Sequence, residues 1–474
     1  MKIIKRVFVV LIALFSIVLI STGAIVVVDK IGTSYLDDES EISTYLITNV
    51  NIVPMAQDTV LTNMELLIEK GLITRISKKI DRQGIEVIDA KGNYLMPGLI
   101  DMHVHIWDRY ELGLYLSNGV TAIRNLWGMP MHLRIKEDAI NGDIISPQFY
   151  TTGPKLTGFE FIGDDNLNLS DPLEAKQKVM SYRERGYDFI KTYYGLDKEI
   201  FDAIIEQSII SEMDIVSHPS HKVPFSYHSN SQIKSIEHAE EIVQQPLAFD
   251  LDTIKMQAIV DSISISNQVN YCPTIIVFNN IYQMMINDSI LYSESLKYMN
   301  PLIKMTDSKK QFERWYNAKN EDPNTVDRIK NQHDFHLKIV QELHKAGVSL
   351  ICGTDAGIGV TLPGFSIHQE LAFYKEAGLS NFEVLQTATI NAAKTHEIMN
   401  QMGTIEVGKM ANLIIIENNP LEDLSSLKRP ITVFVNGRKI DRKSLDYFEE
   451  KAKDRNNLIA TAIRYVENLI IEKN

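Results

Sequence analysis

The chain has 474 residues, of which 45% are hydrophobic, and a formal net charge of −13 at pH 7. This composition is that of a globular protein with one sizeable core and accessory parts, and it excludes a disordered or collagen-like chain. The negative balance argues against a nucleic-acid partner, because phosphates require Lys and Arg. Cys272 and Cys352 lie in apolar strand-like runs and form no disulfide framework.

The first 28 residues differ from the rest of the chain. The basic start "MKIIKR" precedes an uncharged apolar stretch, and its length of about 22 residues is enough to cross a bilayer. We therefore expect residues 1–28 to be a membrane anchor, with a cleaved signal peptide and secretion as the alternative. The basic cluster before the apolar stretch predicts an extracytoplasmic catalytic domain, on the periplasmic or outer face. Residues 29–44 are polar and predict a linker.

The remaining pattern predicts an α/β protein with two parts. Short strands with turns fill residues 45–97. From residue 98 to 399, eight apolar strand-like runs alternate with amphipathic helical stretches, which is typical of a (β/α)8 TIM barrel. Strand patterns return at 400–440, so we expect this segment and 45–97 to pair into a composite β-sandwich. Residues 280–345 predict a helical insertion or lid, and 441–474 a helical tail.

Two histidines stand at alternate positions in the first barrel run, "GLIDMHVHIWD". On a strand, residues i and i+2 point to the same side, so His103 and His105 both face the barrel axis. The C-terminal end of such a strand is where barrels of this kind hold their chemistry. Two imidazoles placed in this way can bind one metal ion, typically zinc.

Four later runs also end in a polar side chain. They are "YDFIK" with Lys191, "DIVSH" with His218, "KSIEH" with His238 and "LICGTD" with Asp355. A barrel aims all of these groups into one cavity. A buried lysine loses its proton readily, and a neutral amine can add CO2 to become a carbamate with two oxygens that bridge two metals.

The motifs "GLIDMHVH", "FIKTYYG", "VSHPSH", "SIEHAE" and "GTDAG" together resemble the metal-dependent amidohydrolase superfamily, in its imidazolonepropionase-like and prolidase-like branch. The resemblance extends from about residue 45 to residue 440. It implies a binuclear barrel hydrolase in which His103, His105 and Asp355 hold one divalent metal, His218 and His238 hold the second, and a carboxylated Lys191 bridges them. The metals are expected to be Zn2+.

Parts of the chain depart from this pattern. The "NLWG" after Arg124 replaces the usual small, glycine-rich turn. The stretch "PKLTGFEFIGDDNLNLSD" and the region 280–345 are specific to this chain, and both are expected to reshape the substrate pocket.

The predicted reaction is cleavage of a C–N bond, in an amide, peptide-like or cyclic amide substrate, by a metal-bridging hydroxide with Asp355 as general base and then acid. Tyr193, His221 and His368 are candidate substrate-binding residues. Hydrolysis of esters, lactones or phosphotriesters at the same site is one alternative, and a non-catalytic membrane-anchored binding protein is another. The expected partner is a small-molecule or dipeptide-like substrate, and the sequence leaves open whether the chain forms a homo-oligomer.

Overall fold

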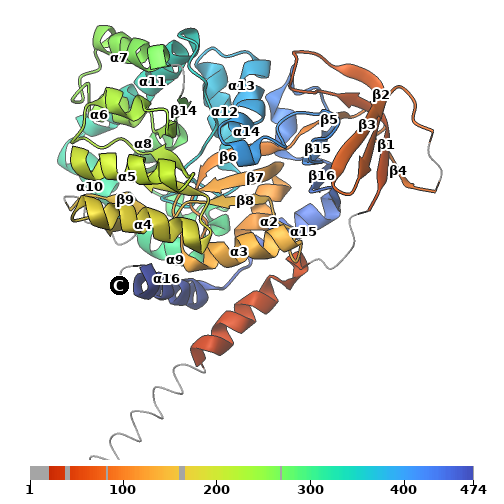
Figure 1. Ribbon diagram of the computed structural model, residues 1–474, viewed down its shortest axis with the longest axis horizontal. Coiled ribbons are helices and arrows are strands. Elements are labelled where there is room, and N and C mark those ends of the chain that lie inside the picture. The colour runs from red at the N-terminus through yellow and green to blue at the C-terminus, as the bar shows by residue number, and fades with distance from the viewer. Residues whose placement is uncertain (1–20, 38–42, 82–83, 160–165, 267–268, 473–474) are drawn as a thin grey trace, which may run out of the picture.

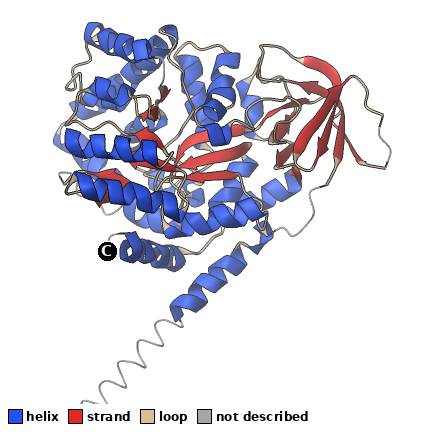
Figure 2. Ribbon diagram, viewed as in Figure 1, coloured by secondary structure: helices blue, strands red, loops and turns tan. Residues whose placement is uncertain are grey.

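The computed structural model describes residues 21–37, 43–81, 84–159, 166–266 and 269–472. Its centre is a set of parallel strands surrounded by helices, and a sheet built from both ends of the chain lies at its side (Figures 1 and 2). The predicted α/β class is therefore confirmed.

The central strands are short and buried. Three of them form one parallel sheet: β6 (Leu99–Val104), β7 (Val120–Asn125) and β8 (Gln148–Thr151). Four others are consecutive neighbours in a second parallel sheet: β11 (Phe189–Thr192), β12 (Asp214–Ser217), β13 (Ile233–Glu237) and β14 (Asn270–Cys272). The second sheet continues past β11 into β9 (Lys155–Thr157) and β10 (Asn166–Asn168).

Three isolated parallel bridges connect these sheets into a ring. The bridge between Thr152 and Phe189 joins the end of β8 to β11. The segment around Leu350 bridges to Tyr271 of β14, and Ala356 at its end bridges back to Val104 of β6. Eight parallel segments thus follow one another around the centre, as in a (β/α)8 barrel. Their carboxyl ends lie at one rim.

Helices cover the outside of this ring, because each crossover between parallel strands needs one. They are α2 (Tyr110–Ser117), α3 (Pro130–Asn141), α4 (Pro172–Arg185), α5 (Lys198–Ile210), α6 (Glu240–Gln244), α7 (Thr253–Ser266), α8 (Ile276–Ile286), α11 (Asn324–Lys345), α12 (Ser366–Glu376), α13 (Asn381–Thr387) and α14 (Ile390–Lys394). Local sequence sets their ends. In α4, the Asp171 side chain accepts hydrogen bonds from the N–H groups of Leu173 and Glu174, and Gly186 ends the helix in the left-handed region.

The lateral sheet joins the two ends of the barrel sequence. It consists of β1 (Tyr45–Ile52), β2 (Leu61–Glu69), β3 (Leu72–Ser77), β4 (Glu86–Asp89), β5 (Tyr94–Pro97), β15 (Leu413–Ile416), β16 (Thr432–Val435) and β17 (Arg438–Asp441). The early and late segments meet where β5 pairs antiparallel with β15, and Figure 1 shows them side by side. An antiparallel bridge between Leu72 and Met410 brings the edge strand β3 next to the chain just before β15.

Two further groups of helices lie near the rim of the barrel. The first group comes from the region between α8 and α11, and it comprises α9 (Pro301–Ile303), a π-helical turn (Lys304–Ser308) and α10 (Lys309–Glu321). The second group is the C-terminal pair α15 (Arg442–Lys453) and α16 (Leu458–Glu472). α15 packs on α2, and α16 packs on α9 and α3.

The predicted membrane anchor is contradicted. Among the residues that the structure describes, no helix combines the length and apolar character needed to cross a bilayer, and residues 1–20 of the predicted segment lie outside those residues. The helix of residues 21–32 carries Asp29, which is buried and pairs with Arg464 of α16. The extracytoplasmic location that we inferred from an anchor is therefore not retained.

Candidate active site

The six side chains that the sequence predicted as ligands lie at the carboxyl ends of the barrel strands. His103 belongs to β6 and His105 follows it, and Lys191 belongs to β11. His218 follows β12, His238 follows β13 and Asp355 ends the segment after Leu350. All six line one cavity of about 640 Å3.

Two histidines converge on one carboxylate oxygen. The Nε2 atoms of His105 and His103 lie 2.7 and 3.3 Å from Oδ1 of Asp355. Burial opposes ionisation of Asp355, but His103 and His105 outweigh it and hold the pKa of this carboxyl well below its usual range. Nitrogen and oxygen atoms of His103, His238 and Asp355 lie within 4.8 Å of one another, a spacing that suits one metal ion.

The four imidazoles form a row. Ring centroids are 5.5 Å apart between His105 and His103, 4.7 Å between His103 and His238, and 4.7 Å between His238 and His218. His105 therefore stands at one end of the row and His218 at the other. The nitrogen atoms of four rings and the carboxylate of Asp355 offer enough donors for two metal ions.

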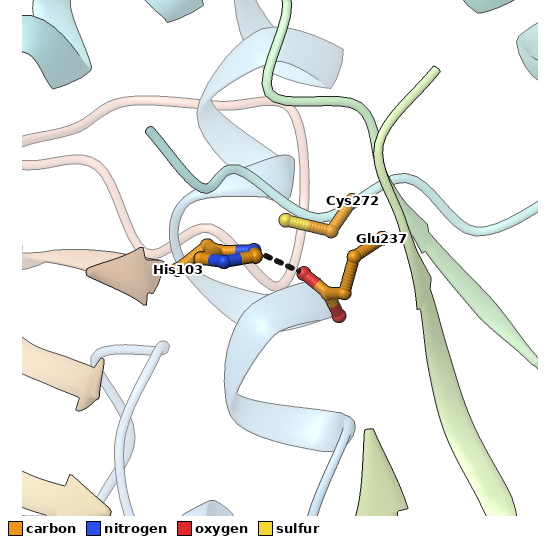
Figure 3. A group of neighbouring side chains, drawn as sticks. All are labelled: His103, Glu237 and Cys272. Carbon is orange, nitrogen blue, oxygen red and sulfur yellow. Dashed lines mark hydrogen bonds and ion pairs between the residues drawn. The ribbon is translucent and has the colours of Figure 1, made fainter. Parts of the chain in front are cut away.

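Neighbouring side chains fix which ring nitrogen faces the cavity. Nδ1 of His103 lies 2.8 Å from Oε2 of Glu237 (Figure 3). Burial raises the pKa of Glu237, but Arg124 and His103 outweigh it and hold this pKa well below its usual range, so Glu237 is an acceptor and His103 carries its proton on Nδ1. Nδ1 of His238 lies 2.8 Å from Oγ1 of Thr274, a hydroxyl that can accept its proton. Nε2 of both rings remains available to a metal.

Figure 3 also shows Cys272 beside His103 and Glu237, and the spacing of these three groups would fit a metal ion. Two observations argue against a site there. Oε1 of Glu237 is engaged 2.9 Å from the guanidinium of Arg124, and burial raises the pKa of the Cys272 thiol well above its ordinary value. We therefore interpret this group as the support that orients His103.

Lys191 is buried without a partner. Its Nζ has no hydrogen-bond partner among the described residues, and burial lowers the pKa of its ammonium to about 8. Nδ1 of His105 and Nδ1 of His218 are buried without partners as well. A buried amine in a cavity with imidazole nitrogens that lack partners fits a site that holds metal ions and a modified lysine, and it suits a self-contained protein core poorly.

Two of these positions have a strained backbone. His238 has a φ of 72° and Asp355 a φ of 58°, in the left-handed region that side chains with a Cβ rarely adopt. Such strain costs on the order of 1–3 kcal/mol at each residue and is typical of functional sites. It turns both side chains toward the cavity after their strands end.

The three predicted substrate-binding residues lie in different places. Tyr193 lines the cavity, with its ring 4.2 Å from that of His218. His221 does not line the cavity, and its ring packs 4.3 Å from Tyr194. His368 lies in α12 and lines a separate hollow with Lys428.

Other cavity residues were missed in the sequence. Trp107 and Trp127 line the cavity, although "NLWG" had already stood out as a departure. Lys155 lies with its Nζ 4.7 Å from the centre of the Tyr193 ring. Residues around α9, within the region 280–345 that was expected to reshape the pocket, also line the cavity. Residues of α16 complete the lining, and no motif marked them because they come from outside the barrel strands.

A parallel barrel with four histidines, an aspartate and a buried lysine at its strand ends has the make-up of a metal-dependent hydrolase. The family model described as "Amidohydrolase family" matches residues 223–440. This match over just under half of the chain supports the metal-dependent amidohydrolase superfamily, which the motifs predicted.

Known proteins are similar to this chain, either over most of its length at low identity or over a short stretch at higher identity. An ochratoxinase of Aspergillus niger is 24% identical, covering 79% of this chain and 81% of that protein. A solved bottromycin amidohydrolase is 22% identical with a TM-score of 0.74, covering 90% and 94%. A solved Xaa-Pro dipeptidase is 19% identical with a TM-score of 0.66, covering 84% and 100%. A dihydroorotase of Carboxydothermus hydrogenoformans matches at 52% identity over 13% of this chain, and this chain spans only 14% of that protein.

Proposed function

We propose that this protein hydrolyses an amide or peptide-like C–N bond in a small molecule or dipeptide-like substrate. The observation that carries the proposal is the row of four imidazoles closed by Asp355, with the unpaired amine of Lys191 beside it, in a cavity large enough for a small molecule. The names of the relatives support the substrate class, because they include an amidohydrolase and a dipeptidase.

The residues fit a pair of divalent metal ions, for which zinc is our choice. His103, His105 and Asp355 would hold one ion, His218 and His238 the other, and a carbamate on Lys191 would bridge them. When bound, two such ions supply Lewis-acid polarisation of the substrate carbonyl and activation of the attacking water.

The residues of the chain supply proton transfer and positioning. Asp355 accepts a proton as the water oxygen bonds to the carbonyl carbon, and it delivers that proton to the nitrogen as the C–N bond breaks. The products are a carboxylic acid and an amine. Glu237 and Thr274 keep His103 and His238 in the required tautomer throughout. Tyr193 lies beside His218 and can donate a hydrogen bond to a substrate oxygen.

A substrate panel tests this function. The full chain is supplied with Zn2+ and bicarbonate and assayed against N-acyl amino acids, dipeptides, lactones and phosphotriesters. We expect turnover of one or more amides, and a loss of about 100- to 10,000-fold in kcat in Asp355→Asn, as expected for removal of a general base. Turnover confined to lactones or phosphotriesters would contradict the amide assignment.

A further inference from the structure

One wall of the cavity is aromatic. Trp107 and Trp127 stand edge to face with ring centroids 4.6 Å apart. Tyr465 of α16 lies 6.4 Å from the first and 6.1 Å from the second. The three rings come from two barrel loops and from the C-terminal helix, and all line the cavity.

Aliphatic side chains extend this wall. Leu302 and Ile303 of α9 and Ala462 and Val466 of α16 line the cavity next to Tyr465. α16 packs against α9, so the two helices together form a wall that the barrel alone does not provide. A continuous apolar wall of this kind recognises an apolar ligand group and gains free energy by removing it from water.

The wall lies at a defined end of the row of imidazoles. The ring of Trp127 is 6.4 Å from His105, at one end of the row, whereas Tyr193 and Lys155 lie at the other end beside His218. A substrate bound across the row therefore places one of its ends against the aromatic rings. Trp127 is buried, and its Nε1 has no hydrogen-bond partner among the described residues.

The position of α16 is fixed by buried polar contacts. Asn457, just before the helix, donates a hydrogen bond to Asp108 at 2.9 Å. At the other end of the helix, Glu472 accepts hydrogen bonds from Arg185 and from the hydroxyl of Tyr187. Both contacts join α16 to the barrel, so Tyr465 is held in place as a fixed wall.

We propose that these residues form a subsite for a large apolar substituent of the substrate, with preference for an aromatic ring. The proposal rests on the proposed amide hydrolysis for its kinetic test only. The subsite is defined by Trp107, Trp127, Tyr465, Ala462 and Ile303. It selects amides that carry an aryl or similarly bulky apolar group on one side of the scissile bond.

Substrate pairs that differ only in the apolar group test the selection. N-phenylacetylglycine and N-acetylphenylalanine are each compared with N-acetylglycine. We expect kcat/KM to be about 30-fold or more higher for at least one of the two aromatic substrates, which is the scale of burying one ring. Tyr465→Ala reduces that ratio to about 3-fold.

Two further variants keep the test independent of helix stability. Ala462→Phe fills the subsite without removing a contact, so it lowers kcat/KM for the aromatic substrate more than for N-acetylglycine. Ile459→Ala changes an exposed side chain of α16 that does not line the cavity and retains the wild-type ratio. An unchanged ratio in both Tyr465→Ala and Ala462→Phe overturns the subsite.

A binding measurement separates this proposal from the proposed function. Two of the three tryptophans line the subsite, so a Trp315→Phe background isolates their fluorescence. Phenylbutyrate, with butyrate as the control, is titrated into the full chain supplied with Zn2+. We expect a fluorescence change with phenylbutyrate alone, with a Kd weakened about 10-fold or more in Ala462→Phe. Identical responses to both acids overturn the subsite. Selective binding of phenylbutyrate without turnover of any amide counts against the proposed function only.

Discussion

At the scale of single residues, the imidazoles of the site depend on partners that hold their protons. For His238 that partner is the hydroxyl of Thr274, whose Oγ1 lies 2.8 Å from Nδ1. Partners of this kind fix the ring tautomer, and their loss weakens metal binding about 10- to 100-fold.

Thr274→Val removes the hydroxyl and keeps the shape of the side chain. We expect Zn2+ affinity to fall about 10- to 100-fold, measured by competition with a chromogenic chelator. Thr274→Ser restores the hydroxyl and is expected to restore affinity. Equal affinity in the Val and Ser variants would show that Thr274 does not orient His238.

A second prediction at this scale concerns Lys191. If its amine carries the bridging carbamate, Lys191→Ala removes a bridging anion, so we expect metal content to fall from about two ions per chain to one or fewer and turnover to collapse. Short carboxylic acids added to the buffer are expected to restore part of the activity by filling the vacancy.

The matched variant is Lys191→Arg. A guanidinium stays protonated and cannot take up CO2, so this variant is expected to behave like Lys191→Ala. Metal content and turnover are measured for both variants side by side. Near-wild-type values in Lys191→Arg would rule out the bridging role.

At the scale of elements, the loop after Asp355 depends on a glycine. Gly357 has a φ of +101°, and a Cβ at this position would lie 2.0 Å from the carbonyl oxygen of His105. The loop must therefore approach the backbone of β6 closely, which holds Asp355 and His105 together. Gly347 provides a control, because its φ is +77° but nothing lies within 4 Å of its added Cβ.

Gly357→Ala combines a strained backbone with a steric clash. We expect it to lower the free energy of unfolding by about 3 kcal/mol or more and to weaken metal binding at His105. Gly347→Ala adds only the backbone strain, at a cost of about 1 kcal/mol. Urea denaturation and zinc content of the two variants give the comparison, and equal losses would refute the role of close packing.

The elements that carry a local signal could be predicted from the sequence. Ser380 and Glu383 are spaced as a capping box, and the structure has that box at the start of α13. Strands ending in His218, His238 and Asp355 were visible because parallel strands present their ends at one rim. His368 followed a strand in the sequence too, but the intervening loop carried it away, and loop direction leaves no periodic signal.

Contacts between distant segments could not be predicted from the sequence. Glu237 supports His103, which lies 134 residues earlier in the chain, and no spacing rule connects them. α16 has the amphipathic pattern of any packed helix, so its pattern could not reveal that it would meet Trp107. The long apolar start of the chain favoured an anchor on hydropathy alone, whereas no helix among the described residues is long and apolar enough to cross a bilayer.

At the scale of the whole molecule, the C-terminal segment is joined to the barrel by a buried charge cluster. Arg455 lies 3.4 Å from Asp108 and 3.5 Å from Glu111, and all three side chains are almost fully buried. Burial and Asp108 together raise the pKa of Glu111 to about 8. Removing the cation therefore leaves acidic groups without compensation.

Arg455→Ala is expected to lower the free energy of unfolding by about 3–5 kcal/mol, as when one partner of a buried ion pair is removed. Arg429→Ala is the control, since Arg429 pairs with Asp446 at an exposed position and should cost only about 0–1 kcal/mol. Urea denaturation of the two variants measures the difference, and a loss in Arg455→Ala no larger than that of the control would contradict the role of the cluster.

The stability of the whole fold should also fall in mild acid, because histidines are buried in neutral form. His132 is a case outside the metal site: its Nε2–H donates to the carbonyl of Ile106, and its Nδ1 accepts from the N–H of Met129. Burial lowers the pKa of His132 to about 3.

A histidine whose pKa is lower in the folded state stabilises the fold above its unfolded pKa of about 6.5, and that contribution is lost as pH falls below it. Between pH 7.5 and 5.5 the loss is about 1.4 kcal/mol for His132. We expect urea denaturation of the metal-stripped protein to show a pH dependence that is smaller by this amount in His132→Gln, since the remaining histidines titrate alike in both proteins. The same pH dependence in wild type and variant would mean that His132 is not held neutral by the fold.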